Sequence, residues 1–112
     1  MPDKNTYLLV LCSCPDKEIA TTISENIVAQ HLAACINIVP GIKSVYHWQG
    51  NVESAEESLM LIKTHQQKFS SLKNTITTMH PYEVPEIISV DISDGLPKYL
   101  DWITSSMRLK GE

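Results

Sequence analysis

The segment from His80 to Glu86 holds an imidazole and two carboxylates between and beside two prolines. Pro81 cannot continue a helix and disfavours helical geometry at the preceding residue, so the segment ends one element and forms a rigid extended turn. Such a turn presents its polar side chains at little entropic cost. A thiol that can bind a soft metal lies far upstream at Cys12, so the central question is whether Cys12 and His80 meet in space.

Together, Cys12, Met79 and His80 would offer a metal ion a thiolate, a thioether and an imidazole, which form a soft ligand set. Glu83 and Glu86 could add oxygen ligands or orient the histidine without touching the metal. A structural interpretation is equally open, in which His80 caps the negative end of a helix and Cys12 belongs to the core. The spacing does not match a closed zinc site, so sequence alone leaves the choice open.

The chain has three cysteines, Cys12, Cys14 and Cys35, and the first two are only one residue apart. An odd number and this short spacing argue against a structural disulfide, so we expect reduced thiols. Cys35 follows two alanines and is expected in the core. Cys12 and Cys14 point the same way only if their strand persists through Ser13.

Two other classes of function compete with a metal site. In an enzyme, Cys12 before a helix start would be the nucleophile and His80 its base, but nothing beside them resembles a known nucleophile motif. In a signalling or scaffold protein, clefts between subunits would bind a small anion or a partner. The four glycines are scattered through turns and the terminus, so no glycine-rich phosphate loop supports that alternative.

Composition indicates one domain spanning residues 1–112, with a core large enough to fold without disulfides. The 9 basic and 13 acidic residues give a formal charge of -4, and no basic stripe is present, so nucleic-acid binding is not expected. The apolar stretch at 8–12 is far shorter than a membrane span, and no basic and apolar leader precedes it. We therefore expect a cytoplasmic protein without a membrane partner.

Apolar periodicity predicts an α+β chain in which strands and helices alternate. The expected elements are a strand at 7–12, a helix from Pro15 to about Leu32, a strand at 35–49 bent at Pro40-Gly41, a strand at 52–64 after a turn at Gly50-Asn51, a helix from about Gln67 to His80, a strand at 88–92 and a helix at 96–107. This order is the βαββαβ arrangement of ferredoxin-like folds, an antiparallel sheet with an extra C-terminal helix.

The central hairpin is too long for a compact monomer. Each arm has about fourteen residues and would reach roughly 46 Å if straight. A compact chain of this size has a radius of gyration of about 13 Å, which corresponds to a sphere roughly 34 Å across. A protruding hairpin would leave apolar side chains in water, including Val45, Tyr46, Trp48, Leu59 and Leu61. We therefore predict that the hairpin protrudes and joins neighbouring subunits.

Several long segments, in the same order, resemble the divalent-cation-tolerance proteins of the CutA family. They are Leu32-Ala33-Ala34-Cys35-Ile36-Asn37-Ile38-Val39-Pro40, Ser44-Val45-Tyr46-His47-Trp48-Gln49-Gly50, Leu61-Ile62-Lys63-Thr64, the segment from His80 to Glu86, and Tyr99-Leu100-Asp101-Trp102-Ile103. The resemblance implies a ferredoxin-like subunit, related in architecture to PII signalling proteins, in a homotrimer with interlocked hairpins.

The resemblance also implies tolerance of copper and other divalent cations. Family roles as copper ligands transfer to Cys12 and His80, which in a trimer could both face a cleft between subunits. Related sequences can carry two histidines before the Pro-Tyr pair, whereas this chain has Met79 before His80. A thioether is a softer and weaker ligand than imidazole, so a site that includes Met79 would favour Cu(I) over Cu(II) or zinc. Glu83 remains a further candidate ligand.

Overall fold

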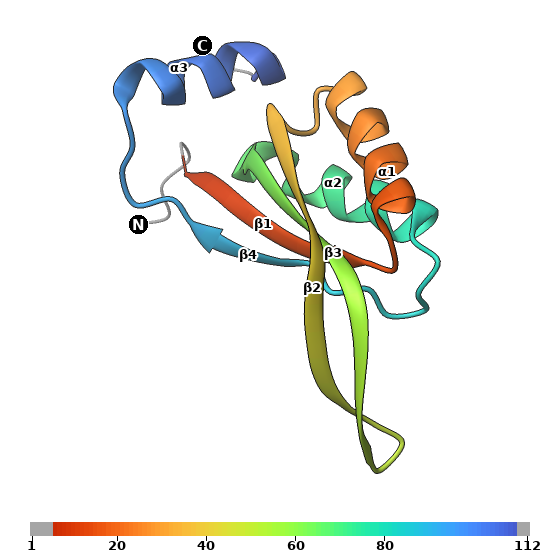
Figure 1. Ribbon diagram of the computed structural model, residues 1–112. Coiled ribbons are helices and arrows are strands. Elements are labelled where there is room, and N and C mark those ends of the chain that lie inside the picture. Colours follow the sequence, from red (N-terminus) through yellow and green to blue (C-terminus); the bar gives the residue numbers. More distant parts are fainter. Residues whose placement is uncertain (1–5, 110–112) are drawn as a thin grey trace.

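The computed structural model describes residues 6–109, which form one antiparallel sheet and three helices (Figure 1). The elements in chain order are β1 (Tyr7–Cys14), α1 (Lys17–Ala29), β2 (Cys35–Trp48), β3 (Asn51–His65), α2 (Gln66–Met79), β4 (Ile88–Asp91) and α3 (Pro97–Met107). The predicted order of elements is confirmed. In the described part of the chain, no helix is long and apolar enough to cross a membrane.

The four strands lie in the order β2-β3-β1-β4, and every neighbouring pair is antiparallel. This is the expected ferredoxin-like α+β fold, with β1 and β3 in the centre of the sheet. Figure 1 shows α1 and α2 together on one face, while α3 lies at the end of the sheet away from the hairpin tip. The topology therefore leaves most of the second sheet face without a helical cover.

The main core lies between the sheet and the helices α1 and α2. Alternate residues of β1 are buried from Leu8 through Val10 to Cys12, as period-two alternation requires for a strand with one covered face. Residues at helical spacing supply the opposite side of this core: Ile23, Ile27, Leu72 and Ile76, each no more than 1% exposed. Each fully buried aliphatic side chain contributes about 1.5–3 kcal/mol relative to exposure.

Local signals define where the helices begin and end. The carboxylate of Asp16 accepts a hydrogen bond from the Ile19 amide at 2.9 Å, which caps the first turn of α1. The α2 helix ends at Met79, because Pro81 holds the preceding residue, His80, in an extended conformation (φ -76°, ψ 137°). The turn that carries the candidate ligands is therefore fixed to the helix end by proline chemistry.

The hairpin of β2 and β3 has arms of 14 and 15 residues and protrudes below the sheet (Figure 1). The Cα radius of gyration is 14.8 Å, and the principal extents are 47 × 30 × 23 Å, which confirms the elongated shape. A register shift between Val39 and Ile42 bends β2 at the predicted site, where Gly41 has a positive φ of 72°. The hairpin is long because both strands continue past this bend.

The hairpin turn is one residue earlier than predicted. Trp48 pairs with Asn51, so Gln49 and Gly50 form the two-residue turn and Asn51 already belongs to β3. Both turn residues have positive φ, at 49° and 82°, as a hairpin that follows the twist of its strands requires. The sequence signal was ambiguous because Gly50 fits either turn position, and only the cross-strand register decides.

Helix α3 covers one end of the second sheet face. Its buried residues Ile103 and Met107 pack with Ala34 and Leu109 in a small second core, against which Tyr7 also lies. The Tyr7 hydroxyl is hydrogen-bonded to Thr104 of α3, which ties the helix to β1. The rest of this face stays open, and all four residues of β4 are exposed.

Candidate metal centre

Cys12 and Cys14 lie on the same face of β1, because the strand continues through Ser13 to Cys14. Cys12 is opposite Met60 and Cys14 is opposite Ser58 on β3, and both thiols are fully buried. The strand thus persists through Ser13, as the two thiols require in order to point the same way. Cys14 was only a weak signal in the sequence, and the alternation that continues from Leu8 and Val10 could have identified it.

His80 lies beside this strand end and makes two hydrogen bonds. Its Nε2 is 2.8 Å from the Ser13 carbonyl oxygen, and its Nδ1 accepts from the Tyr82 amide at 3.1 Å. These partners assign the proton to Nε2, because a carbonyl can only accept and an amide can only donate. The ring is thus buried, neutral and held in one orientation next to the residue that separates the two cysteines.

The side chains of Cys12, Cys14 and His80 form a buried cluster whose ligand atoms all lie within 4.8 Å of one another. Two sulfurs on one ion at about 2.3 Å each are about 4.6 Å apart in a linear arrangement and closer in a bent one. The separation of the two sulfurs is therefore compatible with a shared metal ion. Two thiols and an imidazole are ligands for Cu(I) and zinc, and they are poor ligands for magnesium or calcium.

The cluster forms within a single chain. The structure brings Cys12 and His80 together through β1 and the end of α2 without a second subunit. The expected proximity of Cys12 and His80 is thus found within one chain, and their exposure to a cleft between subunits stays a prediction. Cys12, Cys14 and Cys35 are free cysteines in the structure.

The two thiols influence each other's ionisation. A hydrogen bond from the Cys12 thiol lowers the pKa of Cys14, although burial acts in the opposite direction. The same hydrogen bond to Cys14, followed by burial and by the negative charge on Cys14, raises the pKa of Cys12. Both shifts favour a thiolate on Cys14 over a thiolate on Cys12.

Tyr82 and Glu57 close the turn over the cluster. The Tyr82 hydroxyl donates a hydrogen bond of 2.6 Å to Glu57 Oε2, and the Tyr82 and His80 rings lie 4.7 Å apart. Glu57 is only 8% exposed although it is an acid on a strand. Burial and this hydrogen bond both raise the pKa of Tyr82, so the phenol keeps its proton. Glu57 could not be identified from the sequence, because nothing in the pattern of β3 shows which side chain Tyr82 contacts.

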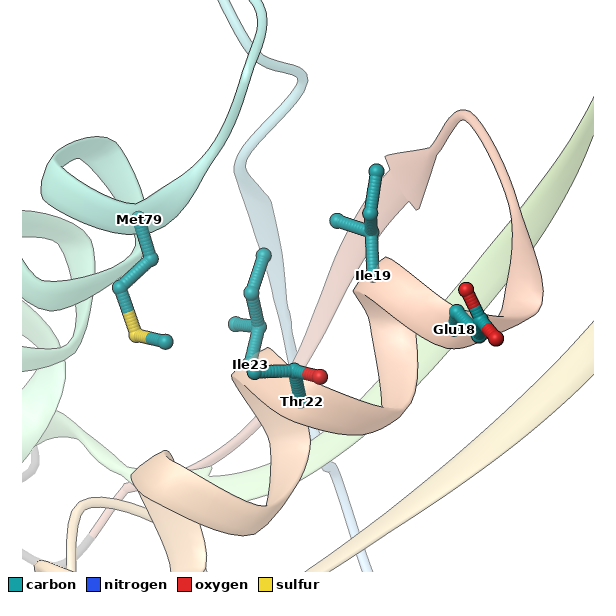
Figure 2. Close-up of a pocket in the computed structure, with 5 residues that line it drawn as sticks. All are labelled: Glu18, Ile19, Thr22, Ile23 and Met79. Atoms are coloured by element: carbon teal, nitrogen blue, oxygen red, sulfur yellow. The ribbon is translucent and has the colours of Figure 1, made fainter.

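Met79 and Glu83 lie outside the cluster of close ligand atoms. Met79 packs against the main core, and Figure 2 shows its side chain directed toward Ile23 of α1, where both line a shallow surface hollow. Glu83 is exposed in the turn. Glu86 is also exposed, yet its charge raises the pKa of Cys12, so the two residues are close enough to interact.

The hydrogen bonds also bear on the enzyme alternative. A base for Cys12 would have to accept its proton, but both ring nitrogens of His80 are occupied by main-chain groups. The Cys12 sulfur lies 3.9 Å from the Ser13 carbonyl oxygen, and it is fully buried. This arrangement is typical of a structural or metal-binding thiol and differs from that of an activated nucleophile.

Comparison with known proteins agrees with the fold and the motifs. Residues 8–106 match the family model of the CutA1 divalent ion tolerance protein. The divalent-cation tolerance protein CutA of Thermus thermophilus is 46% identical over 95 residues, which cover 85% of this chain and 92% of that protein. A solved divalent cation tolerance protein from the same organism has a TM-score of 0.85, with 45% identity, and the match covers 87% and 94% of the two chains.

The names of two other relatives give different cellular compartments. The chloroplastic CutA protein of Arabidopsis thaliana is 43% identical over 90% of this chain, which spans 56% of that protein's length. The solved periplasmic divalent cation tolerance protein CutA of Archaeoglobus fulgidus has a TM-score of 0.88 and 36% identity, covering 90% of this chain and 98% of its own. The match spans nearly the whole described structure at well above 30% identity, and the chain belongs to the CutA1 divalent ion tolerance protein family.

Proposed function

We propose that this protein is a non-enzymatic, homotrimeric divalent-cation tolerance protein that binds copper or a related thiophilic ion through Cys12, Cys14 and His80. The single observation that carries the metal proposal is the buried cluster of three ligand atoms within 4.8 Å. Membership of a divalent ion tolerance family supports the same role. We also propose a cytoplasmic location, where free thiols such as these stay reduced.

Cysteines supply the stronger part of the proposed site. Two thiolates favour Cu(I) and other soft ions, so reduced copper is the preferred cargo, and other divalent cations with an affinity for sulfur come second. His80 can bind a metal only after it gives up its hydrogen bond to Ser13 or to Tyr82. We therefore assign the primary ligands to the thiols and a third position to the imidazole. Met79 and Glu83 have no assigned contact with the metal in this proposal.

A copper titration under reducing, anaerobic conditions tests the assignment. Cu(I) is added against a competing chromophoric chelator, and the thiolate-to-metal absorbance is followed in the ultraviolet. Replacing Cys12 or Cys14 by serine should weaken binding by about 100-fold or more, and His80→Ala by about tenfold, since even residues behind the ligands cost 10–100-fold. Cys35→Ser and Met79→Leu are the matched controls and should bind as the wild type does. Equal affinity in all six proteins would refute the site.

The trimer proposal rests on apolar surface that one chain leaves open. On the hairpin, Val45 is 64% exposed, Trp48 is 61% exposed and Val52 is 70% exposed. The sheet face opposite α1 and α2 is also apolar and only partly covered, at Leu9, Leu11, Val39, Leu59, Leu61, Ile88 and Val90. Contiguous apolar surface of this kind usually marks an interface. A second copy is the natural occupant, because the exposed edge of β4 and the long arms of the hairpin can extend each other's sheets.

Light scattering on the purified chain tests the trimer. One chain has a mass of 12.6 kDa, so three copies should give about 38 kDa at micromolar concentration. Trp48→Glu should shift the protein toward lower mass, because a charge would be buried in the proposed contact. Val28→Glu, on an exposed position of α1, should leave the mass unchanged. A wild-type mass equal to that of one chain would refute the trimer and leave the metal proposal standing.

A further inference from the structure

Cys12 and Cys14 are placed to react with each other. Both side chains lie on the same face of β1, and their sulfurs lie within 4.8 Å of each other. Residues i and i+2 of a strand have Cα atoms about 6.6 Å apart. Disulfides join cysteines whose Cα atoms are roughly 4.4–6.8 Å apart, so this pair lies near the upper limit of that range. Rotation of the two side chains can therefore join the sulfurs while the strand stays in the sheet.

Cys35 cannot replace either cysteine of this pair. It lies opposite Lys63 of β3, which is itself opposite Leu9 of β1. Directly opposed residues share a face of the sheet, and Leu9 points to the face opposite to that of Cys12 and Cys14. The chain has three cysteines, so each thiol of the pair has only the other as an intramolecular partner on its own face of the sheet.

We propose that Cys12 and Cys14 form a reversible disulfide that switches the metal site off. The effect on metal rests on the proposed function, whereas formation of the disulfide does not. A bridge between residues i and i+2 at the limit of the Cα range is strained, and strained disulfides are the easily reduced, regulatory ones. The spacing that argues against a permanent structural disulfide therefore favours a temporary one.

A small disulfide such as oxidised glutathione supplies the oxidising equivalents. The thiolate of one cysteine attacks a sulfur of the oxidant, which forms a mixed disulfide and releases one glutathione thiolate. The thiolate of the other cysteine attacks the protein sulfur of that mixed disulfide, forms the internal disulfide and releases the second glutathione thiolate. The two cysteines thereby lose two electrons and two protons, and the S–S bond of the oxidant is reduced to two thiols. Both protein thiols are fully buried, so the oxidant reaches them when the 80–86 turn opens.

The disulfide removes two of the three proposed metal ligands. Cysteine binds metals as the thiolate, and the two sulfurs of a disulfide carry no such charge. They also lie about 2.05 Å apart, which leaves no room for an ion between them. Only His80 then remains, and its Nε2 is hydrogen-bonded to the Ser13 carbonyl oxygen at 2.8 Å. Oxidation should therefore release a bound ion, and by linkage a bound ion should protect the thiols from oxidation.

Mass spectrometry of the metal-free Cys35→Ser protein tests the disulfide. The reduced chain is incubated with excess oxidised glutathione, the reaction is stopped with acid, and remaining thiols are alkylated with N-ethylmaleimide. We expect most chains to have the mass of one chain with neither an alkyl group nor glutathione attached, and dithiothreitol should restore both thiols. Cys12→Ser and Cys14→Ser in the same background should stop at a glutathione adduct or a free thiol, and circular dichroism checks that each variant is folded.

Doubly alkylated chains, glutathione adducts or disulfide-linked dimers in place of the internal disulfide would overturn the proposal. The Cu(I) titration then tests the effect on metal. The isolated disulfide form should bind about 100-fold more weakly than the reduced form or not at all, as expected when the thiolates are lost. Equal binding by the two forms would overturn the switch. Failure of the reduced form to bind copper would refute the proposed function and the switch together, while the mass measurement would still establish the disulfide.

Discussion

Replacing Tyr82 by phenylalanine removes one hydroxyl and tests whether the 80–86 turn controls access to the cysteines. That hydroxyl donates to the carboxylate of Glu57 at 2.6 Å, and Glu57 is almost fully buried. A hydrogen bond to a charged group contributes about 1.5–3 kcal/mol. Because Tyr82 is 37% exposed, water can replace part of the lost donor, and we expect a loss of ~1–2 kcal/mol.

Two measurements on Tyr82→Phe separate stability from access. Urea denaturation should show the unfolding free energy reduced by that amount. Cys12 and Cys14 are fully buried beneath the turn, so a thiol reagent reaches them only when the turn opens. If opening becomes easier by the same free energy, labelling of these two thiols by iodoacetamide should accelerate by roughly 5–30-fold, as mass spectrometry of the labelled peptides would show.

Tyr46→Phe is the matched control for Tyr82→Phe. Tyr46 is an exposed tyrosine of the hairpin, and its charge influences the pKa of Tyr82, so it lies in the same region. Its replacement should change neither stability nor labelling by a measurable amount. If Tyr82→Phe matches this control in both measurements, the turn is held by other contacts. If it loses stability with unchanged labelling, the hydrogen bond supports the fold without covering the thiols.

Three further changes test other parts of the structure. Asp16→Ala should cost about 1 kcal/mol of unfolding free energy, because the Ile19 amide at 2.9 Å loses its cap, while Asp16→Asn should cost little; urea denaturation measures both. Ile76→Ala leaves a cavity at a fully buried position and should cost ~2–5 kcal/mol by the same assay, and a smaller loss would show a loosely packed core. The raised pKa values of Tyr82 and Tyr99 predict that absorbance titration at alkaline pH resolves late-ionising phenols, which Tyr82→Phe and Tyr99→Phe should remove. Since folding raises these pKa values, their stabilising contribution is complete below about pH 10 and is lost as pH rises further.

The sequence was a good guide to the fold because its local signals agree with one another. Pro15 was expected to open the first helix, and α1 begins two residues later at Lys17, with Asp16 as its cap. Pro81 marks the end of α2 and alternation marks β1, so these boundaries have a physical cause. The length of the hairpin also followed from residue counts alone. The position of its turn did not, because only the pairing of Trp48 with Asn51 shows which two residues lie at the tip.

The cysteine cluster was predictable only in part. Cys12 and His80 were the expected candidates, and the structure brings them close together. The role of Cys14 depended on how far β1 continues. The sequence before Pro15 does not show at which residue the strand ends. Glu57 depended on where the ring of Tyr82 comes to lie, and a contact between two loop or strand residues 25 positions apart has no signature in either segment.

The meeting of Cys12 and His80 follows from matched element lengths. β1 and β3 are antiparallel, with Tyr7 opposite His65, so β3 ends where β1 begins. α2 starts there and runs back for 14 residues, which is about 21 Å at 1.5 Å per residue. β1 has 8 residues, or about 26 Å at 3.3 Å each. Helix α2 therefore runs back along nearly the whole length of β1 before Pro81 ends it. His80, the residue after the helix, consequently lies beside Ser13 and the two thiols.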